Sequence, residues 1–283
     1  MSYQELALKF ACGDDPLFGI ASVPDRPARR GVLVVVGGPQ YRAGSHRQFT
    51  LLARALAGQG FAVLRFDYRG MGDSGGAMRD FERVDDDLRC ALDQFFAAVP
   101  ALEEVVIWGL CDGASAALLY AEKDPRVSGL VLLNPWARSE QGLARSTLKH
   151  YYTARLLDPQ LWKKIFLLRF DYRATLRSLG ATLRTVLAGA RGNGGPAAAA
   201  PSFQLRMQQG MSRFRGKVLL IISGADLTAR EFLDMAEGSP AWRKLLAAPA
   251  VSRQTLAPAD HTFSRRVWRD QVAGWTADWL RSW

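Results

Sequence analysis

The sequence predicts an α/β fold with a mostly parallel central sheet and helices on both of its faces. Three observations support this prediction. Apolar runs of strand length alternate with helix-like stretches, the runs end in glycine-rich or polar loops, and those loops carry the reactive side chains. Such alternation implies right-handed crossovers between parallel strands. Because ligands bind at the carboxyl ends of strands in these sheets, the loops are the expected site.

The first part of the chain predicts a hairpin followed by two buried strands. Residues 5–10 and 17–23 alternate apolar and polar side chains, and the Gly-Asp-Asp-Pro segment between them favours a turn. Residues 31–36 form a continuous apolar run, which is typical of a strand buried on both faces. A long glycine-rich loop, a helix over 48–57 and a strand over 61–66 follow.

The middle of the chain contains the stretch around which the function is predicted. After an amphipathic helix over 82–99, the apolar run 105–110 enters the sequence Gly-Leu-Cys-Asp-Gly and continues as a helix of small residues to 120. This pattern predicts a nucleophile elbow with Cys111 at its centre, because flanking glycines let neighbouring backbone pack closely. The N-terminus of the following helix favours a thiolate at that position.

A helical insertion is expected to interrupt the sheet. Residues 1–136 and 216–283 are predicted to form the core, and 137–215 a helical lid with a mobile Gly/Ala/Pro-rich segment at 188–202. After a strand over 126–133, the sheet resumes with strands at 217–223 and 251–256 and ends in a helix over 265–281. Four tryptophans at helical spacing in that helix predict a core-facing stripe rather than a membrane anchor: Trp268, Trp275, Trp279 and Trp283.

The second half supplies an acid and a histidine at strand ends. A cysteine or serine hydrolase needs an imidazole to move the proton of the nucleophile and a carboxylate to orient that imidazole. His261 follows the last predicted strand and Asp226 the one before it, so the chain order is nucleophile, acid, histidine. Asp260, beside His261, is interpreted as a loop residue. We therefore predict a Cys111–His261–Asp226 triad.

Composition and motifs argue against nucleic-acid binding, metal binding, cofactor binding and membrane insertion. The net charge is +10, but the arginines are scattered and no nucleic-acid-binding motif is present, so nucleic acid is not an expected partner. Three cysteines without metal-ligand spacing indicate neither a metal site nor a disulfide framework. No dinucleotide fingerprint is present, and no cofactor is expected. The absence of a signal-peptide pattern and of an apolar run of about 18–20 residues predicts a cytoplasmic protein without stable membrane insertion.

These motifs together resemble the α/β-hydrolase superfamily over nearly the whole chain. More narrowly, the sequence is similar to the exosortase A system-associated hydrolases of the first type. That similarity rests on the Gly-Gly-Pro-Gln-Tyr-Arg loop from residue 37, the cysteine elbow, and the Ser-Gly-Ala-Asp-Leu-Thr segment from residue 223. The resemblance implies a bacterial exopolysaccharide and protein-sorting context, with proteins of that system as partners.

Two features depart from the superfamily pattern. Cysteine replaces the usual serine, as in dienelactone hydrolase-like members, and Gly-Gly-Pro replaces the usual His-Gly-x of the first oxyanion loop. Pro39 has no N–H, so the N–H of Asp112 is the expected oxyanion donor, with Gly38 or Gln40 as the second. Tyr41 and His46 in the same loop are candidates for substrate contact, and for His46 a structural hydrogen bond is favoured over that contact.

The sequence therefore predicts an enzyme that cleaves an ester, thioester or similar acyl bond of a small molecule through an acyl-cysteine intermediate. An acyltransferase to a sugar or other hydroxyl would use the same residues and is separated only by its products. The other alternative is a non-catalytic partner protein with the same fold. Selective alkylation of Cys111 over Cys12 and Cys90 discriminates between an enzyme and such a partner.

Overall fold

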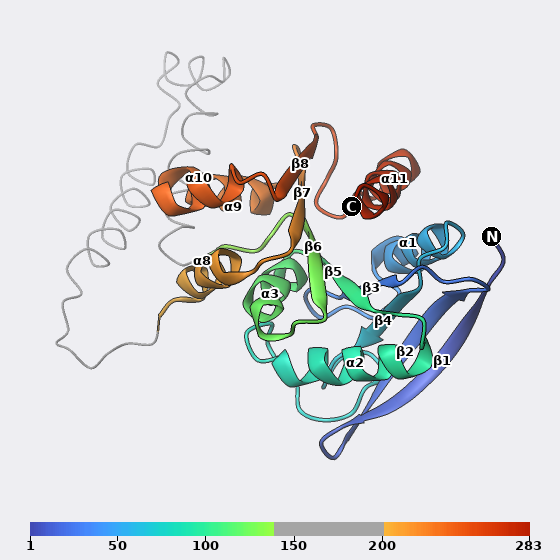
Figure 1. The fold of residues 1–283 in the computed structure, drawn as a ribbon. Helices are drawn as coiled ribbons and strands as arrows, with labels where there is room; N and C mark the ends of the chain where they lie inside the picture. Colours follow the sequence, from blue (N-terminus) through green and yellow to red (C-terminus); the bar gives the residue numbers. More distant parts are fainter. Residues whose placement is uncertain (139–200) are drawn as a thin grey trace, which may run out of the picture. The chain divides into compact units, whose positions relative to one another are not determined.

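The central feature of the protein is an eight-stranded sheet with the strand order β1-β2-β4-β3-β5-β6-β7-β8 (Figure 1). This computed structural model describes residues 1–138 and 201–283. Met1–Ala137 and Pro201–Trp283 form one compact unit that contains the whole sheet. The predicted α/β fold with a mostly parallel sheet is confirmed.

The first two strands form the antiparallel edge of the sheet. β1 (Tyr3–Cys12) pairs with β2 (Asp15–Pro24) across a two-residue turn, and β2 pairs antiparallel with β4 (Val63–Asp67). The predicted hairpin is therefore present, with both strands longer than expected. The added residues continue the pairing of β1 with β2, since Tyr3 lies opposite Pro24 and Cys12 opposite Asp15.

The parallel strands bring the predicted site loops to one edge. β3 (Arg30–Val35), β5 (Glu104–Leu110), β6 (Val127–Leu133), β7 (Lys217–Ser223) and β8 (Val251–Leu256) run parallel to β4. Their carboxyl ends are in register, because Leu110 lies opposite Leu133, and Leu133 lies opposite Ile221. The loops after β5, β6, β7 and β8 therefore meet.

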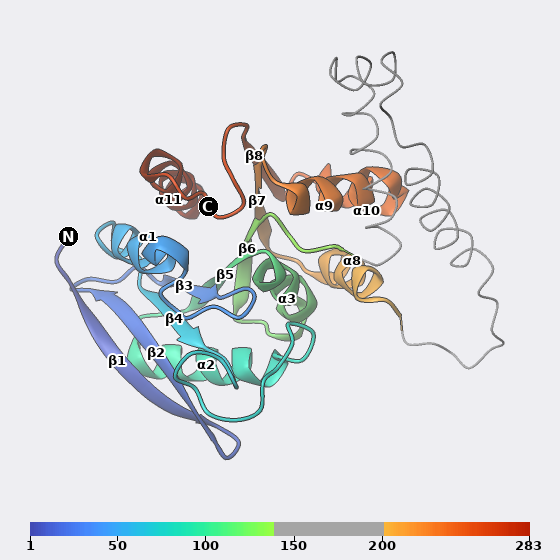
Figure 2. The same ribbon diagram turned by 180° about the vertical axis from the view of Figure 1, so that it is seen from behind.

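Helices cover both faces of the sheet, as seen from the two sides in Figures 1 and 2. One face packs against α1 (Gln48–Ala57) and α11 (Arg266–Arg281). The other packs against α2 (Asp85–Ala98), α3 (Asp112–Tyr120), α8 (Phe203–Arg213), α9 (Leu227–Gly238) and α10 (Pro240–Leu246). Two single turns of 3₁₀ helix lie at Ser45–Arg47 and Ala121–Lys123.

The tryptophan stripe of α11 faces the core, as predicted. Trp268 and Trp279 are buried, and Trp275 and Trp283 are partly buried against the same apolar cluster. The guanidinium of Arg30 lies 3.5 Å from the centre of the Trp283 ring, which adds a cation–π contact at the end of the helix. Among residues 1–138 and 201–283, no helix is long and apolar enough to cross a membrane.

The predicted lid lies mostly outside the described residues. Residues 139–200, including the Gly/Ala/Pro-rich segment 188–202 except for its last two positions, are not described. The final part of the predicted insertion forms α8, which packs so closely on α3 that a Cβ at Gly210 would lie 2.1 Å from the carbonyl oxygen of Leu118. The boundaries of the insertion stay a prediction.

Candidate active site

Cys111 lies in a strained turn between β5 and α3. Its backbone has φ 60° and ψ −125°, an unusual conformation for a residue with a side chain. The turn is held by hydrogen bonds from the N–H of Cys111 to the carbonyl of Leu133 (2.9 Å) and from the N–H of Trp136 to the carbonyl of Cys111 (3.1 Å). The predicted strand–turn–helix geometry is therefore present, and Cys111 lies at its apex.

The glycines on either side of Cys111 allow the close backbone approach that this turn needs. A Cβ at Gly109 would lie 2.5 Å from the carbonyl carbon of Gly113, and a Cβ at Gly113 would lie 2.5 Å from the carbonyl oxygen of Val35. Both contacts are with backbone, which cannot move aside as a flexible side chain can. The Gly-x-Cys-x-Gly spacing thus has a steric cause.

Substituting alanine for Gly113 is expected to destabilise the protein by about 2–4 kcal/mol, since the new methyl group overlaps the backbone of β3. Gly274 of α11 is the matched control, because a Cβ there meets nothing within 4 Å. Gly274→Ala should stabilise the protein by about 0.5–1 kcal/mol. Urea unfolding of both variants measures the two effects, and equal effects would contradict the steric explanation.

His261 and Asp226 meet at the ends of β8 and β7. His261 Nδ1 lies 2.7 Å from Asp226 Oδ2. The Asp226 carboxylate is buried, and it also caps α9 by accepting the backbone N–H groups of Thr228 and Ala229, at 3.1 Å each. These three bonds fix the carboxylate, which in turn fixes the imidazole ring.

The remaining nitrogen of His261 is left for Cys111. Asp226 binds Nδ1 at 2.7 Å, and the Cys111 side chain is close enough to the ring to affect its pKa. The hydrogen bond with Asp226, followed by the interaction with Cys111, raises the pKa of His261 to about 10 against the opposing effect of burial. The structure thus brings together all three predicted triad residues, with the imidazole between the thiol and the carboxylate.

The raised pKa of His261 predicts a pH-dependent contribution to stability. The folded protein retains the imidazole proton up to a pKa of about 10, whereas the unfolded chain loses it near 6.5. The stabilisation is therefore complete below pH 6.5 and is lost as the pH rises through about 10. Urea unfolding from pH 6 to about 10.5 should show the wild type losing its advantage over His261→Gln; a constant difference would contradict this assignment.

Asp260 has a different role from Asp226. Its carboxylate accepts the backbone N–H of Ser264 at 2.9 Å and also binds the Ser264 hydroxyl. These bonds close the turn that follows β8 and carries His261. This matches its interpretation as a loop residue.

Sequence reasoning missed Asn134, which connects the three strand ends. Asn134 is fully buried after β6 with φ 43°. Its Nδ2 donates to Ser223 Oγ (2.8 Å) and to the carbonyl of His261 (3.0 Å), and its Oδ1 accepts the N–H of Ser223 (2.9 Å). A polar residue directly after a buried strand was the available signal. Asn134 thereby positions the backbone of the catalytic-histidine candidate.

In the first oxyanion loop the N–H of Gln40 is bonded within the loop, whereas the N–H of Gly38 faces the Asp112 carboxyl. The N–H of Gln40 donates to the carbonyl of Gly38 at 2.8 Å, so it is already engaged. Gly38 has φ 63°, which suits glycine, and Gly37 packs against the elbow, since a Cβ there would lie 2.3 Å from both Asp112 Oδ1 and the carbonyl oxygen of Leu110. The N–H of Gln40 is therefore engaged, and Gly38 stays the predicted second donor.

The side chain of Asp112 is enclosed beside this loop. Its Oδ1 is shielded from solvent and has no hydrogen-bond partner among the described residues. Burial raises the pKa of the Asp112 carboxyl, and the backbone N–H groups of Gly38 and Gly113 partly offset that effect. The N–H of Asp112 begins α3 directly after Cys111, which is the position expected of an oxyanion donor.

Tyr41 and His46 take part in contacts within the protein. The Tyr41 hydroxyl donates to Asp73 Oδ2 at 2.5 Å, and Arg42 binds both Asp73 and the buried Asp67, which ties this loop to the one after β4. The Tyr41 side chain remains exposed. His46 accepts a hydrogen bond from Arg269 (3.3 Å) through its carbonyl group. Substrate contact by either residue stays a prediction.

A parallel sheet with a strained elbow after β5, an acid after β7 and a histidine after β8 defines an α/β-hydrolase. The model of the Hydrolase_4 family, described as serine aminopeptidase, S33, matches residues 27–171, which is 145 of the 283 residues. The chain belongs to this family of α/β-hydrolase enzymes. No curated protein sequence matches it significantly.

Solved structures share the fold at low sequence identity. An esterase from Pyrococcus furiosus is 16% identical, with a TM-score of 0.66 over 99% of this chain and 93% of its own. A dienelactone hydrolase from Anabaena variabilis is 17% identical, with a TM-score of 0.63 over 99% and 98%. A carboxyl esterase from Bacillus coagulans in complex with glycerol is 16% identical, with a TM-score of 0.61 over 99% and 98%.

Proposed function

We propose that this protein hydrolyses an ester, thioester or similar acyl bond with Cys111 as its nucleophile. One observation carries the proposal: Asp226 binds His261 Nδ1 at 2.7 Å, and the Cys111 thiol is close enough to the same ring to raise its pKa. Family membership and esterase structures of the same fold support acyl-bond chemistry. The proposal adds to this the role of Cys111 as the nucleophile.

In the first half of the reaction, the Cys111 proton is proposed to pass to His261 Nε2, where the raised pKa of His261 favours it, before the Cys111 sulfur attacks the acyl carbon. The acyl C=O bond opens to an oxyanion. When that oxyanion collapses, the bond to the leaving group breaks and His261 returns the proton to the departing alkoxide or thiolate. Asp226 stabilises the imidazolium that exists between these steps. The product is an acyl-cysteine and a free alcohol or thiol.

In the second half, water replaces the leaving group. His261 takes a proton from water as its oxygen attacks the acyl-cysteine, and it gives that proton to the sulfur as the thioester bond breaks. A carboxylic acid is released and Cys111 is restored. With a sugar hydroxyl in place of water, the same steps would transfer the acyl group.

The oxyanion is proposed to bind two backbone N–H groups, those of Asp112 and Gly38. The first lies at the N-terminus of α3, where the helix dipole favours negative charge. Removal of one such donor typically costs about 100–1,000-fold in rate. The enclosed carboxyl of Asp112 lies beside these two N–H groups and already interacts with that of Gly38. The oxyanion is therefore stabilised less strongly, so the site suits activated acyl groups better than unactivated ones.

Substrate class follows from the nucleophile. A thiolate reacts readily with thioesters, activated esters and lactones, which are the substrates proposed here. The link to exopolysaccharide or exosortase systems rests on the loop motifs of residues 37–46 and 223–228 and on the cysteine elbow.

The proposal is tested by trapping the acyl-enzyme. Wild-type protein is mixed with p-nitrophenyl acetate to octanoate and with matched acyl thioesters, and intact-mass and peptide analysis locate the added acyl group. Acylation of Cys111 that turns over is the expected result. Folded protein that neither turns over nor labels at Cys111 faster than at Cys12 or Cys90 would favour the non-catalytic partner protein. Adding glycerol as acceptor and analysing products separates hydrolysis from acyl transfer.

A further inference from the structure

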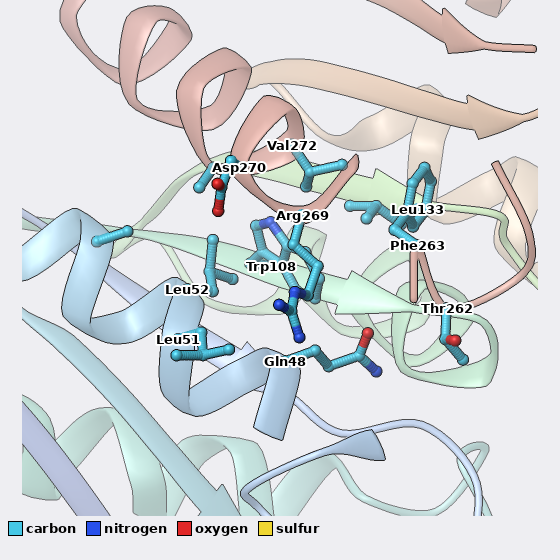
Figure 3. Close-up of a pocket in the computed structure, with 12 residues that line it drawn as sticks. Gln48, Leu51, Leu52, Trp108, Leu133, Thr262, Phe263, Arg269, Asp270 and Val272 are labelled. Carbon is cyan, nitrogen blue, oxygen red and sulfur yellow. The ribbon is translucent and has the colours of Figure 1, made fainter. Parts of the chain in front are cut away.

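A small pocket lies between α1 and α11, on the side of the sheet away from α3 (Figure 3). Its cavity volume is about 40 Å³, and it is bordered by Thr262 and Phe263, which directly follow His261 in the chain. Figure 3 shows the side chain of Arg269 extending from α11 toward Gln48 of α1, with Trp108 of β5 behind them. No step of the proposed reaction uses this pocket.

Three nitrogen donors line the pocket without a hydrogen-bond acceptor. Among the described residues, Gln48 Nε2, Trp108 Nε1 and Arg269 Nε are all buried and unpartnered. Gln48 is 8% exposed and Trp108 3% exposed. An unmade hydrogen bond of this kind costs about 1–3 kcal/mol each, and more at a charged group. Three of them in one place indicate a missing acceptor.

The pocket also carries an uncompensated positive charge. Arg269 binds the carbonyl of His46 at 3.3 Å, and no carboxylate within the described parts of the chain forms an ion pair with it. The neighbouring Asp270, which also lines the pocket, pairs instead with Arg266 at 3.4 Å and is largely exposed. A ligand that satisfies these groups therefore accepts hydrogen bonds and is negatively charged.

We propose that this pocket binds a short monocarboxylate such as acetate or propionate. The volume of about 40 Å³ corresponds to roughly three water-sized sites, which suits a molecule of a few heavy atoms. A planar carboxylate can accept from a guanidinium, an amide and an indole N–H at once. One guanidinium balances one negative charge, and the apolar walls formed by Leu52, Leu133 and Phe263 suit a methyl or ethyl group better than a second charged oxygen.

The experiment follows the indole N–H signal of Trp108. In ¹⁵N-labelled protein the eight tryptophans give separate indole resonances, and Trp108→Phe identifies the one from the pocket. Titration with sodium acetate or propionate should move that resonance in a saturable way. Sodium chloride at equal ionic strength and acetamide should not. Because the pocket does not use Cys111, the Cys111→Ala variant should bind equally, which separates this proposal from the proposed function.

Arg269→Gln tests the charge. Loss of one charge-assisted hydrogen bond should raise the dissociation constant about 10-fold or more. Arg266→Gln is the matched control, since Arg266 lies one turn earlier on the same helix and does not line this pocket. It should change affinity less than about two-fold. A Trp108 resonance unmoved by carboxylate, moved equally by chloride, or moved equally in Arg269→Gln would overturn the proposal.

Discussion

Replacing Cys111 by alanine is expected to lower kcat/KM for ester or thioester substrates by on the order of 10⁴- to 10⁶-fold. Without the sulfur no acyl-enzyme can form, and His261 has no nucleophile to which it can act as base. The fold should be retained, because the side chain is small and the strained backbone of the elbow is held by neighbouring hydrogen bonds. Initial rates with p-nitrophenyl esters, together with the melting temperature, measure both effects.

The other two cysteines provide the matched controls. Burial, and after it a hydrogen bond with Cys90, raise the pKa of Cys12 to about 12, so at neutral pH it remains a thiol. Cys90 lies on α2, away from the strand ends. Iodoacetamide should therefore modify Cys111 first and abolish turnover, whereas Cys90→Ala should retain full activity. Substantial turnover by Cys111→Ala would assign the activity to another group.

Local sequence patterns predicted the elements that carry the site. The apolar runs that became β5 and β7 were recognisable because strands buried on both faces are continuously apolar. The elbow was recognisable because two glycines flank Cys111 at a fixed spacing, although only Gly109 has a local steric cause and Gly113 is required by the backbone of Val35 in β3. The placement of Asp226 and His261 followed from the rule that parallel strands end at one edge.

Long-range contacts were not predictable in the same way. Asn134 acquires its role from Ser223 and His261, which are 89 and 127 residues away in the chain. The N–H of Gln40 is engaged by a turn whose geometry depends on the positive φ of Gly38. The helices α9 and α10 were not predicted, although Asp226 and Ser239 cap them, because their apolar pattern is short. Each of these features depends on contacts that form only in the folded structure.

The second large effect is expected for Asp226→Asn, which should lower kcat/KM by about 10⁴-fold at neutral pH. Asparagine keeps the size of the side chain, and its oxygen can still accept a backbone N–H at the start of α9, so stability should change by less than about 1 kcal/mol. Its NH₂ group, however, would donate to His261 Nδ1 and leave the proton on Nε2. That tautomer cannot accept a proton from Cys111.

The pKa of His261 distinguishes this explanation from a purely structural one. Since Asp226 is the main cause of the value of about 10, the pKa measured by NMR should fall toward its ordinary range in Asp226→Asn. Ser239→Ala is the capping control: it removes the side chain that caps α10 and should cost about 0.5–2 kcal/mol of stability without changing activity. If Asp226→Asn kept the His261 pKa near 10 yet lost activity, orientation by charge would be the wrong account. A loss of stability matching that of Ser239→Ala, with little loss of rate, would reduce Asp226 to a helix cap.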